Sequence, residues 1–273
     1  MRNSGTCLEV FRLSASDHVG WAFDAADEFA RVALDFLTEG AERGELLMYV
    51  AEDPDPAAVD GLVGTVGAEA VQVASIRDVY GASGVVDAAR QRATFAGVLA
   101  DALSGGYTGI RVAADNTPLV LDPERLAAWE QWELVADHFM SENPVTGLCA
   151  FDRNRVEVAR LRHLATLHPM SSASCPVPQY QMFVDDGQLR VVGLVDLFAV
   201  GEMGRALNVL PAKTPVVIDL GTAKMMSTGK VLAALDLLAQ EGNEVTLEGP
   251  LTAVRDARKA AGTSSPHLRF AGW

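Results

Sequence analysis

Two kinds of apolar pattern alternate along the first two thirds of the chain. Short, nearly continuous apolar runs are typical of strands that are buried on both faces of a sheet. Longer segments place their apolar residues three and four positions apart, as on one face of a helix. The predicted strands cover residues 7–13, 14–23, 46–51, 70–76, 109–114 and 145–151. The predicted helices cover residues 25–43, 56–66, 84–104, 155–167 and a segment that begins at Pro123.

Strands that alternate with helices in this way favour a mostly parallel sheet with helices on both faces, in the α/β class. The first helix has a recognisable start, because Asp24 is a candidate N-cap with Asp27 three residues further on. Gly44 follows its last apolar position and marks its end.

A second and shorter α/β pattern begins near residue 189. A polar loop, Met225 to Lys230, opens directly into an apolar helix in this part of the chain. The tail is expected to leave Trp273 exposed or loosely docked. The predicted strands cover residues 189–196, 214–220 and 244–248, and the predicted helices cover residues 201–210, 231–241 and 251–261.

The two patterns are separated by a stretch rich in proline and serine, residues 169–180, which has little apolar periodicity. A length of 273 residues is comfortable for two domains. We therefore predict a first domain over residues 1–170, a linker over 171–180 and a second domain over 181–273.

Composition and charge exclude several classes of protein. Hydrophobic residues make up 49% of the chain, which is enough for a sizeable core. The net charge of −14 argues against direct binding of nucleic acid, which needs a basic surface. No apolar run approaches the roughly 20 residues of a membrane span, and the first residues lack the apolar core of a signal peptide. We expect a cytoplasmic protein that contacts neither nucleic acid nor membrane.

Residues that could catalyse a reaction or bind a ligand or metal are scattered along the sequence. Cys7, Cys149 and Cys175 are odd in number and lack the spacing of a metal motif, so we expect reduced thiols, no metal site and no cofactor. His18 follows Asp17 and is a candidate for ligand contact, with a structural, hydrogen-bonded histidine as the alternative. The other histidines show no metal-ligand spacing. The sequence shows no recognisable motif that would pair a nucleophile with a general base, so we predict no catalytic residue.

Residues from about 17 to 170 resemble a MEDS domain, a sensory module named for methanogens and methylotrophs. Residues 29–53 are also similar to the helix and strand that follow the phosphate loop in RecA-like ATPases of the circadian-clock type. The resemblance rests on the order in which the matching segments follow one another along the chain. These pieces are Asp17-His18 before an aromatic residue, Glu39 to Glu45, Tyr49 to Ala51, Ile110 to Asp115, Pro144 to Asp152, and Leu167-His168-Pro169.

The resemblance implies a degenerate RecA-like fold. The residues before the first long helix contain no G-x-x-x-x-G-K-[ST] sequence, and the acidic residues there would repel a triphosphate, so ATP hydrolysis is not expected. Parallel sheets place ligands at the carboxyl ends of their strands, and a sensory role with an unidentified small-molecule signal is reasonable. The candidate ligand-binding residues are His18, Trp21, Glu52 and Asp115, with a solvated or capping role as the alternative for Glu52 and Asp115.

The C-terminal part resembles a STAS domain, the fold of anti-sigma-factor antagonists. Residues 193–196 lie where that family has a G-E-L-D turn, and residues 216–220 lie where it has its central strand. Residues 225–231 lie where the family has an aromatic residue, an aliphatic residue and then D-S-S-G-L. The sequence departs from this pattern, because Ser227 replaces the aspartate.

The ungapped alignment puts Thr228 on the phosphorylated serine of that family, Gly229 on the second serine and Lys230 on the glycine. A slip of one residue puts Ser227 on the phosphorylated position instead. The alternative for both hydroxyls is a helix N-cap, and a cap also tolerates an added phosphate.

These resemblances imply a non-enzymatic regulator in which a sensory domain controls a STAS domain. The implied partner is an anti-sigma factor of the kinase type, and transcription would be regulated by partner switching. The alternative is a small-molecule- or nucleotide-binding protein whose second domain only mediates homo-oligomerisation. The candidate partner-binding residues are Asp196, Asp219, Met225, Met226, Gly229 and Lys230.

Overall fold

The computed structural model describes residues 2–10, 13–222, 224–225, 228–262 and 265–273. The chain divides into two compact units, which we call the N-terminal unit (residues 2–177) and the C-terminal unit (residues 178–273). Among the described residues, no helix combines the length and the apolar character that crossing a lipid bilayer requires.

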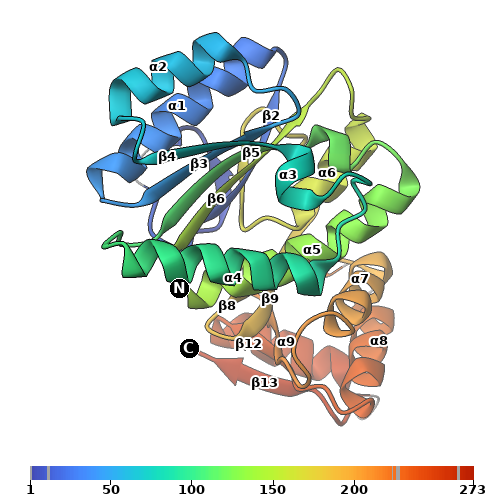
Figure 1. Cartoon of the computed structure of the whole chain (residues 1–273). Coiled ribbons are helices and arrows are strands. Elements are labelled where there is room, and N and C mark those ends of the chain that lie inside the picture. Colours follow the sequence, from blue (N-terminus) through green and yellow to red (C-terminus); the bar gives the residue numbers. More distant parts are fainter. Residues whose placement is uncertain (1, 11–12, 223, 226–227, 263–264) are drawn as a thin grey trace. The chain divides into compact units, whose positions relative to one another are not determined.

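The N-terminal unit is built on a sheet whose strand pairs are all parallel (Figure 1). Its spatial order is β1-β7-β2-β6-β5-β3-β4. The expected parallel sheet is therefore confirmed. Its strands are β1 (Gly5–Cys7), β2 (His18–Phe23), β3 (Leu46–Ala51), β4 (Val71–Ser75), β5 (Ile110–Asp115), β6 (Val145–Asp152) and β7 (Met170–Ser172).

Helices cover both faces of this sheet, with α1 and α2 on one side and α4 and α5 on the other (Figure 1). Alternate residues of each strand point to opposite faces. On β3, Met48 and Val50 join a core with α4 and α5, whereas Leu47 and Tyr49 join a core with α1 and α2. The helices are α1 (Ala26–Glu42), α2 (Pro56–Val66), α3 (Ile76–Tyr80), α4 (Ala88–Ser104), α5 (Pro123–Glu142) and α6 (Val158–Thr166), with a 3₁₀ turn at Thr117–Leu119.

The first strand and the first helix start differently from the prediction. The strand expected over residues 7–13 lies at Gly5–Cys7, where the Gly5 amide donates to the Pro169 carbonyl at 2.8 Å. Residues 11–12 lie outside the described residues. The N-cap of α1 is Ala25, without a side-chain hydrogen bond, and not Asp24. The carboxylate of Asp24 pairs with Arg153 instead, and this charged partner competes with the helix end.

A short helix also replaces the end of one predicted strand. Ile76 begins α3, because Ser75 and Asp78 form a capping box in which each side chain accepts from the other residue's amide.

The last strand of the N-terminal unit crosses the predicted boundary at residue 170 and extends into the predicted linker. Residues 170–172 form β7, which pairs with both β1 and β2, and the two units divide between Val177 and Pro178. The sequence gives little sign of this strand, because three residues are too few to show a periodic pattern.

The C-terminal unit has a smaller sheet in which β8 runs antiparallel to β9 and the other pairs are parallel. The path is β11-β9-β10-β12-β13, and β8 pairs with β9 beside it. Its strands are β8 (Tyr180–Asp185), β9 (Gln188–Val195), β10 (Val216–Asp219), β11 (Lys224–Met225), β12 (Val245–Gly249) and β13 (Arg269–Gly272). Its helices are α7 (Leu197–Leu207), α8 (Thr228–Gln240) and α9 (Leu251–Ala261).

Three details of this unit correct the prediction. Helix α7 begins at Leu197 because Asp196 caps it, accepting from the Ala199 amide at 2.9 Å. Helix α8 already includes Thr228, Gly229 and Lys230, which were expected in a loop. The C-terminal tail contains β13, which pairs in parallel with β12. Trp273 follows it and is exposed, as expected.

Candidate functional site

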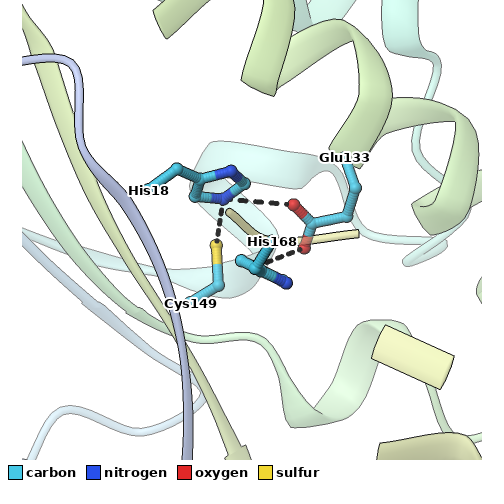
Figure 2. A group of neighbouring side chains, drawn as sticks. All are labelled: His18, Glu133, Cys149 and His168. Carbon is cyan, nitrogen blue, oxygen red and sulfur yellow. Dashed lines mark hydrogen bonds and ion pairs between the residues drawn. The ribbon is translucent and has the colours of Figure 1, made fainter. Parts of the chain in front are cut away.

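Four side chains of the N-terminal unit converge on one buried point (Figure 2). They are His18 on β2, Glu133 on α5, Cys149 on β6, and His168 in the segment between α6 and β7. One ligand-type atom from each residue lies within 4.8 Å of the others. We call this group the buried cluster. Both histidines and Glu133 are fully shielded from solvent, and Cys149 is 8% exposed.

The topology of the sheet explains why these distant residues meet. Strand β2 lies between β6 and β7, so His18 is opposite Gly147, two residues before Cys149 on the same face. His168 enters from the other side, directly before β7. Glycine at position 20 makes room for it, since a Cβ there would lie 3.1 Å from the His168 ring. The fold therefore forms the cluster from two neighbouring strands, the segment that leads into a third strand, and helix α5.

The distances within the cluster are short. The Nε2 atom of His18 lies 3.4 Å from the Cys149 sulfur and 3.3 Å from a carboxylate oxygen of Glu133. The Nε2 atom of His168 lies 3.5 Å from the other oxygen of Glu133. The two imidazole rings are 4.3 Å apart between centroids. Figure 2 shows that the sulfur, the carboxylate and the two rings all point towards the same space.

A second layer of polar groups fixes the two rings. The Nδ1 atom of His18 lies 3.2 Å from the Asp137 carboxylate, which also accepts from Arg2 at 2.8 Å. The Nδ1 atom of His168 lies 2.9 Å from the Leu164 carbonyl. A carbonyl or carboxylate oxygen only accepts, so in both rings the Nδ1 atom carries a hydrogen. Each ring thus presents Nε2 to the cluster.

Burial and mutual charge shift the pKa values of all four groups. Burial lowers the pKa of His168 and raises the pKa of the Cys149 thiol to about 11. Burial also opposes the charged form of Glu133, but the two histidines outweigh it and hold its pKa below the usual range. Burial disfavours charge on His18 as well, yet Cys149, Asp137 and Glu133 together raise its pKa well above the usual value.

A small apolar cavity adjoins the cluster. Its walls include Glu133 and Cys149 together with aromatic side chains such as Phe95 and Trp132. The cavity volume is about 20 Å³, which accommodates roughly one water molecule. The cluster and this cavity therefore form one buried site with a polar end and an apolar end.

Three of the four predicted ligand-binding residues lie at the carboxyl edge of the sheet, and His18 lies apart from them. Trp21 and Asp115 are in register across β6, and Glu52 directly follows β3, the neighbour of β5. His18 belongs to the buried cluster. Trp21 lies on the opposite face of β2, where it packs against the core formed by α1 and α2. Glu52 follows β3, is exposed and pairs with Arg155 at 3.0 Å. Asp115 ends β5, where burial raises the pKa of its carboxyl group and its oxygen accepts from the Thr117 amide at 3.1 Å.

The predicted partner-binding residues of the C-terminal unit share one edge of its sheet. Asp196, Asp219 and Met225 stand at the carboxyl ends of β9, β10 and β11, and Thr228 begins α8. The carboxylates of Asp196 and Asp219 accept from backbone amides of the turns that follow. Gly229 and Lys230 are exposed in the first turn of α8. Met226 and Ser227 lie outside the described residues.

Sequence reasoning missed three of the four cluster residues as site residues. Cys149 and His168 both fall within the pieces that carried the family resemblance, which was the available signal. Glu133 lay outside them. One feature of the sequence could have indicated it: Glu133 and Asp137 are four residues apart and share the buried face of α5. Trp129 and Trp132 are buried on the same helix. Buried carboxylates in such a position need charged or hydrogen-bonding partners.

Comparison with known proteins places the cluster within a family. No curated protein matches the chain. The family model of the MEDS domain, the "MEthanogen/methylotroph, DcmR Sensory domain", matches residues 17–169. This range covers more than half of the 273 residues, begins just before His18 and ends just after His168. It thus contains every residue of the buried cluster, and over this range the chain belongs to the MEDS sensory-domain family.

Proposed function

We propose that this chain is a signalling regulator in which the MEDS unit receives a signal and the C-terminal unit binds a protein partner. Membership of the MEDS family suggests the signalling role. The resemblance of the C-terminal unit to a STAS domain indicates an anti-sigma factor of the kinase type as the partner. The observation that carries the proposal is an apolar edge on the C-terminal unit.

This apolar edge lies at the carboxyl end of the parallel strands. Leu197 and Phe198 directly follow β9 through Asp196, Leu251 follows β12, and Trp273 follows β13. All four side chains are more than half exposed. Large exposed apolar groups gathered at one place mark interaction sites, and aromatic residues often provide the binding energy of a protein interface. Thr228, at the start of α8, belongs to the same edge.

The position of Thr228 supports regulation by phosphorylation. Its hydroxyl is partly exposed and lies 3.4 Å from the Met225 carbonyl at the start of α8. Free amide groups at a helix N-terminus stabilise an added phosphate. A phosphate there would place about two negative charges beside the apolar edge and would oppose the binding of an apolar partner surface.

We include in the proposal that the N-terminal unit does not hydrolyse ATP. Only Asp24 and Ala25 separate β2 from α1, and Asp24 is paired with Arg153. A phosphate loop needs a longer glycine-rich turn and a lysine between these elements. We therefore expect the full chain to show no ATP turnover in an assay in which a known ATPase serves as the positive control.

Replacing Phe198 by alanine is expected to weaken partner binding at least tenfold. Truncating an aromatic hot spot costs about 2 kcal/mol or more, and Phe198 is exposed and makes little contribution to the core. The tagged full chain is used to capture partners from a lysate of its own organism, and captured proteins are identified by mass spectrometry. The affinity of the identified kinase-type partner is then measured with purified proteins. Leu103→Ala, an exposed apolar residue of α4 in the other unit, is the control and should bind normally.

Replacing Thr228 by aspartate is expected to weaken the same complex, whereas Thr228→Ala should keep most of the affinity. The carboxylate mimics part of the charge of a phosphate at the apolar edge. Thr94→Asp is the matched control, because Thr94 is an exposed threonine on α4 of the other unit, and this variant should bind as the parent chain does. If a kinase-type partner is never captured, or if it binds Phe198→Ala and Thr228→Asp as tightly as the parent chain, the proposed function is wrong.

A further inference from the structure

The buried cluster brings together four side chains, of three types, that bind transition metals. Two imidazole nitrogens, one sulfur and one carboxylate converge from four separate segments. Metal–ligand bonds of 2.0–2.3 Å in a tetrahedral site set the ligand atoms about 3.3–3.6 Å apart. Three of the observed separations, 3.3, 3.4 and 3.5 Å, fall in this range, with the first and the last measured to different oxygens of Glu133. One ligand-type atom from each of the four side chains lies within 4.8 Å of the others, so small side-chain shifts would bring all four to one ion.

Both histidine rings are oriented for metal binding through the same atom. Asp137 and the Leu164 carbonyl occupy the two Nδ1 atoms, which leaves each Nε2 atom to face the centre. Histidines that bind metals usually donate their second N–H to a carboxylate or a backbone carbonyl. The structure contains one example of each kind. Arg2 holds Asp137 in turn, at 2.8 Å, so the outer layer is itself fixed.

The carboxylate of Glu133 gives an independent reason to expect a cation. Its two oxygens are buried, and neither accepts a hydrogen bond of good geometry from any residue that the structure describes. They face Nε2 of His18 and Nε2 of His168. Leaving a buried carboxylate without hydrogen bonds is costly, and a cation at the centre would satisfy the oxygen that binds it.

We propose that the N-terminal unit binds one Zn²⁺ ion through Nε2 of His18, Nε2 of His168, the sulfur of Cys149 and the carboxylate of Glu133. A donor set of two nitrogens, one sulfur and one oxygen suits zinc better than the hard ions Mg²⁺ and Ca²⁺, which prefer oxygen. Four protein ligands in a buried place make a closed site, which locks β2, β6, α5 and the segment before β7 together. This inference does not depend on the proposed function, because its tests measure the metal and not the partner.

The first test is the metal content of the untagged full chain, purified without chelator and measured by inductively coupled plasma mass spectrometry. One zinc ion per chain is expected, with a nanomolar or tighter dissociation constant in competition with a chromogenic chelator. A folded chain that contains no zinc, and that takes up none when Zn²⁺ is added back, would overturn the proposal.

The second test identifies the ligands with Co²⁺ in place of zinc. A cobalt–thiolate bond gives a charge-transfer absorption band, which should be present in the parent chain and absent in Cys149→Ser. Cys175→Ser is the matched control, because Cys175 is as buried as Cys149 and lies outside the cluster, so it should keep the band. If Cys149→Ser does not fold, the cobalt spectrum of the parent chain still tests the proposal. A folded parent chain without a cobalt–thiolate band contradicts it.

The third test concerns the outer layer. Asp137→Asn is expected to weaken zinc binding about 10- to 100-fold while the cobalt–thiolate band remains, because the asparagine orients His18 less well and leaves Cys149 bound. Glu133→Gln removes a ligand and should weaken binding further. Equal zinc affinity in Glu133→Gln and the parent chain would show that the carboxylate is not a ligand.

Discussion

Replacing Glu45 by methionine is expected to lower the free energy of unfolding of the N-terminal unit by about 3 kcal/mol. Arg111 on β5 is fully buried, and its Nε atom lies 2.5 Å from the Glu45 carboxylate. Removing one member of a buried ion pair leaves an uncompensated charge and costs roughly 3–5 kcal/mol. We expect a loss at the lower end of this energy range, because the Glu39 carboxylate remains 3.7 Å from the Arg111 guanidinium group and partly compensates its charge.

Urea unfolding followed by tryptophan fluorescence measures this effect. Trp21, Trp129 and Trp132 lie in the N-terminal unit, so three of the four tryptophans report on it. Glu42→Met is the control: it changes the same residue type at an exposed position of α1, and a change within about 0.5 kcal/mol is expected.

A double variant separates lost charge from lost packing. Glu45→Met combined with Arg111→Met replaces the whole pair by apolar side chains, which is often close to neutral for stability. The double variant should therefore recover most of the loss. If it is less stable than Glu45→Met alone, then the contacts of Arg111 with the Phe36 ring and the Phe36 carbonyl, and not its charge, control stability at this position.

Replacing Gly193 by alanine is expected to destabilise the C-terminal unit by about 2–4 kcal/mol. Gly193 has a φ of +93°, which side chains with a Cβ rarely adopt. A Cβ there would also lie 2.6 Å from the Gln179 carbonyl oxygen and 2.9 Å from the Tyr180 Cα, both backbone atoms that cannot rotate away. The backbone strain and the overpacking each cost about 1–2 kcal/mol or more.

Gly187→Ala is the matched control for this variant. Gly187, in the turn between β8 and β9, also has a positive φ, +71°, but an added Cβ there meets no atom within 4 Å. Its alanine variant should therefore lose only the backbone contribution, about 1–2 kcal/mol. Hydrogen exchange of peptides from β8 and β9, read by mass spectrometry, compares the two. Equal loss of protection in both variants would show that the close contact with residues 179–180 does not matter.

The zinc and partner proposals concern different units. Loss of zinc through Cys149→Ser or Glu133→Gln changes the N-terminal unit, whereas Phe198→Ala changes the C-terminal unit. Measuring partner affinity in the zinc-depleted full chain would show whether the two are coupled. Coupling requires that the partner distinguishes the zinc-bound and zinc-free states.

The sequence by itself determined the α/β class, the parallel sheet of the N-terminal unit and most of its long elements. Runs such as residues 46–51 are apolar at every position because their strand is covered on both faces of the sheet. Such a strand can be recognised from consecutive residues alone. The helices followed from their apolar spacing in the same way. Local signals were weaker at short elements. Strands β1 and β7 and helix α3 have three to five residues each, which is too short for a period to appear.

Capping was decided by tertiary partners as well. Asp24 has the right type and spacing for an N-cap, yet Arg153, which is 129 residues away in the sequence, draws its carboxylate from the helix end. Asp196 does cap α7, and no distant cation competes for it among the described contacts. The same residue type therefore acts differently according to charges that local sequence does not reveal.

The buried cluster was decided by the tertiary structure. The sequence pointed to His18 and, through the family resemblance, to the pieces that contain Cys149 and His168. His18 precedes Cys149 by 131 residues and Cys149 precedes His168 by 19, a spacing that resembles no metal motif. Parallel pairing places β2 between β6 and β7, and this order brings His18, Cys149 and His168 to one point. Helix α5 then adds Glu133 from above. Because strand order depends on long-range packing and not on neighbours in sequence, only the folded chain could show this site.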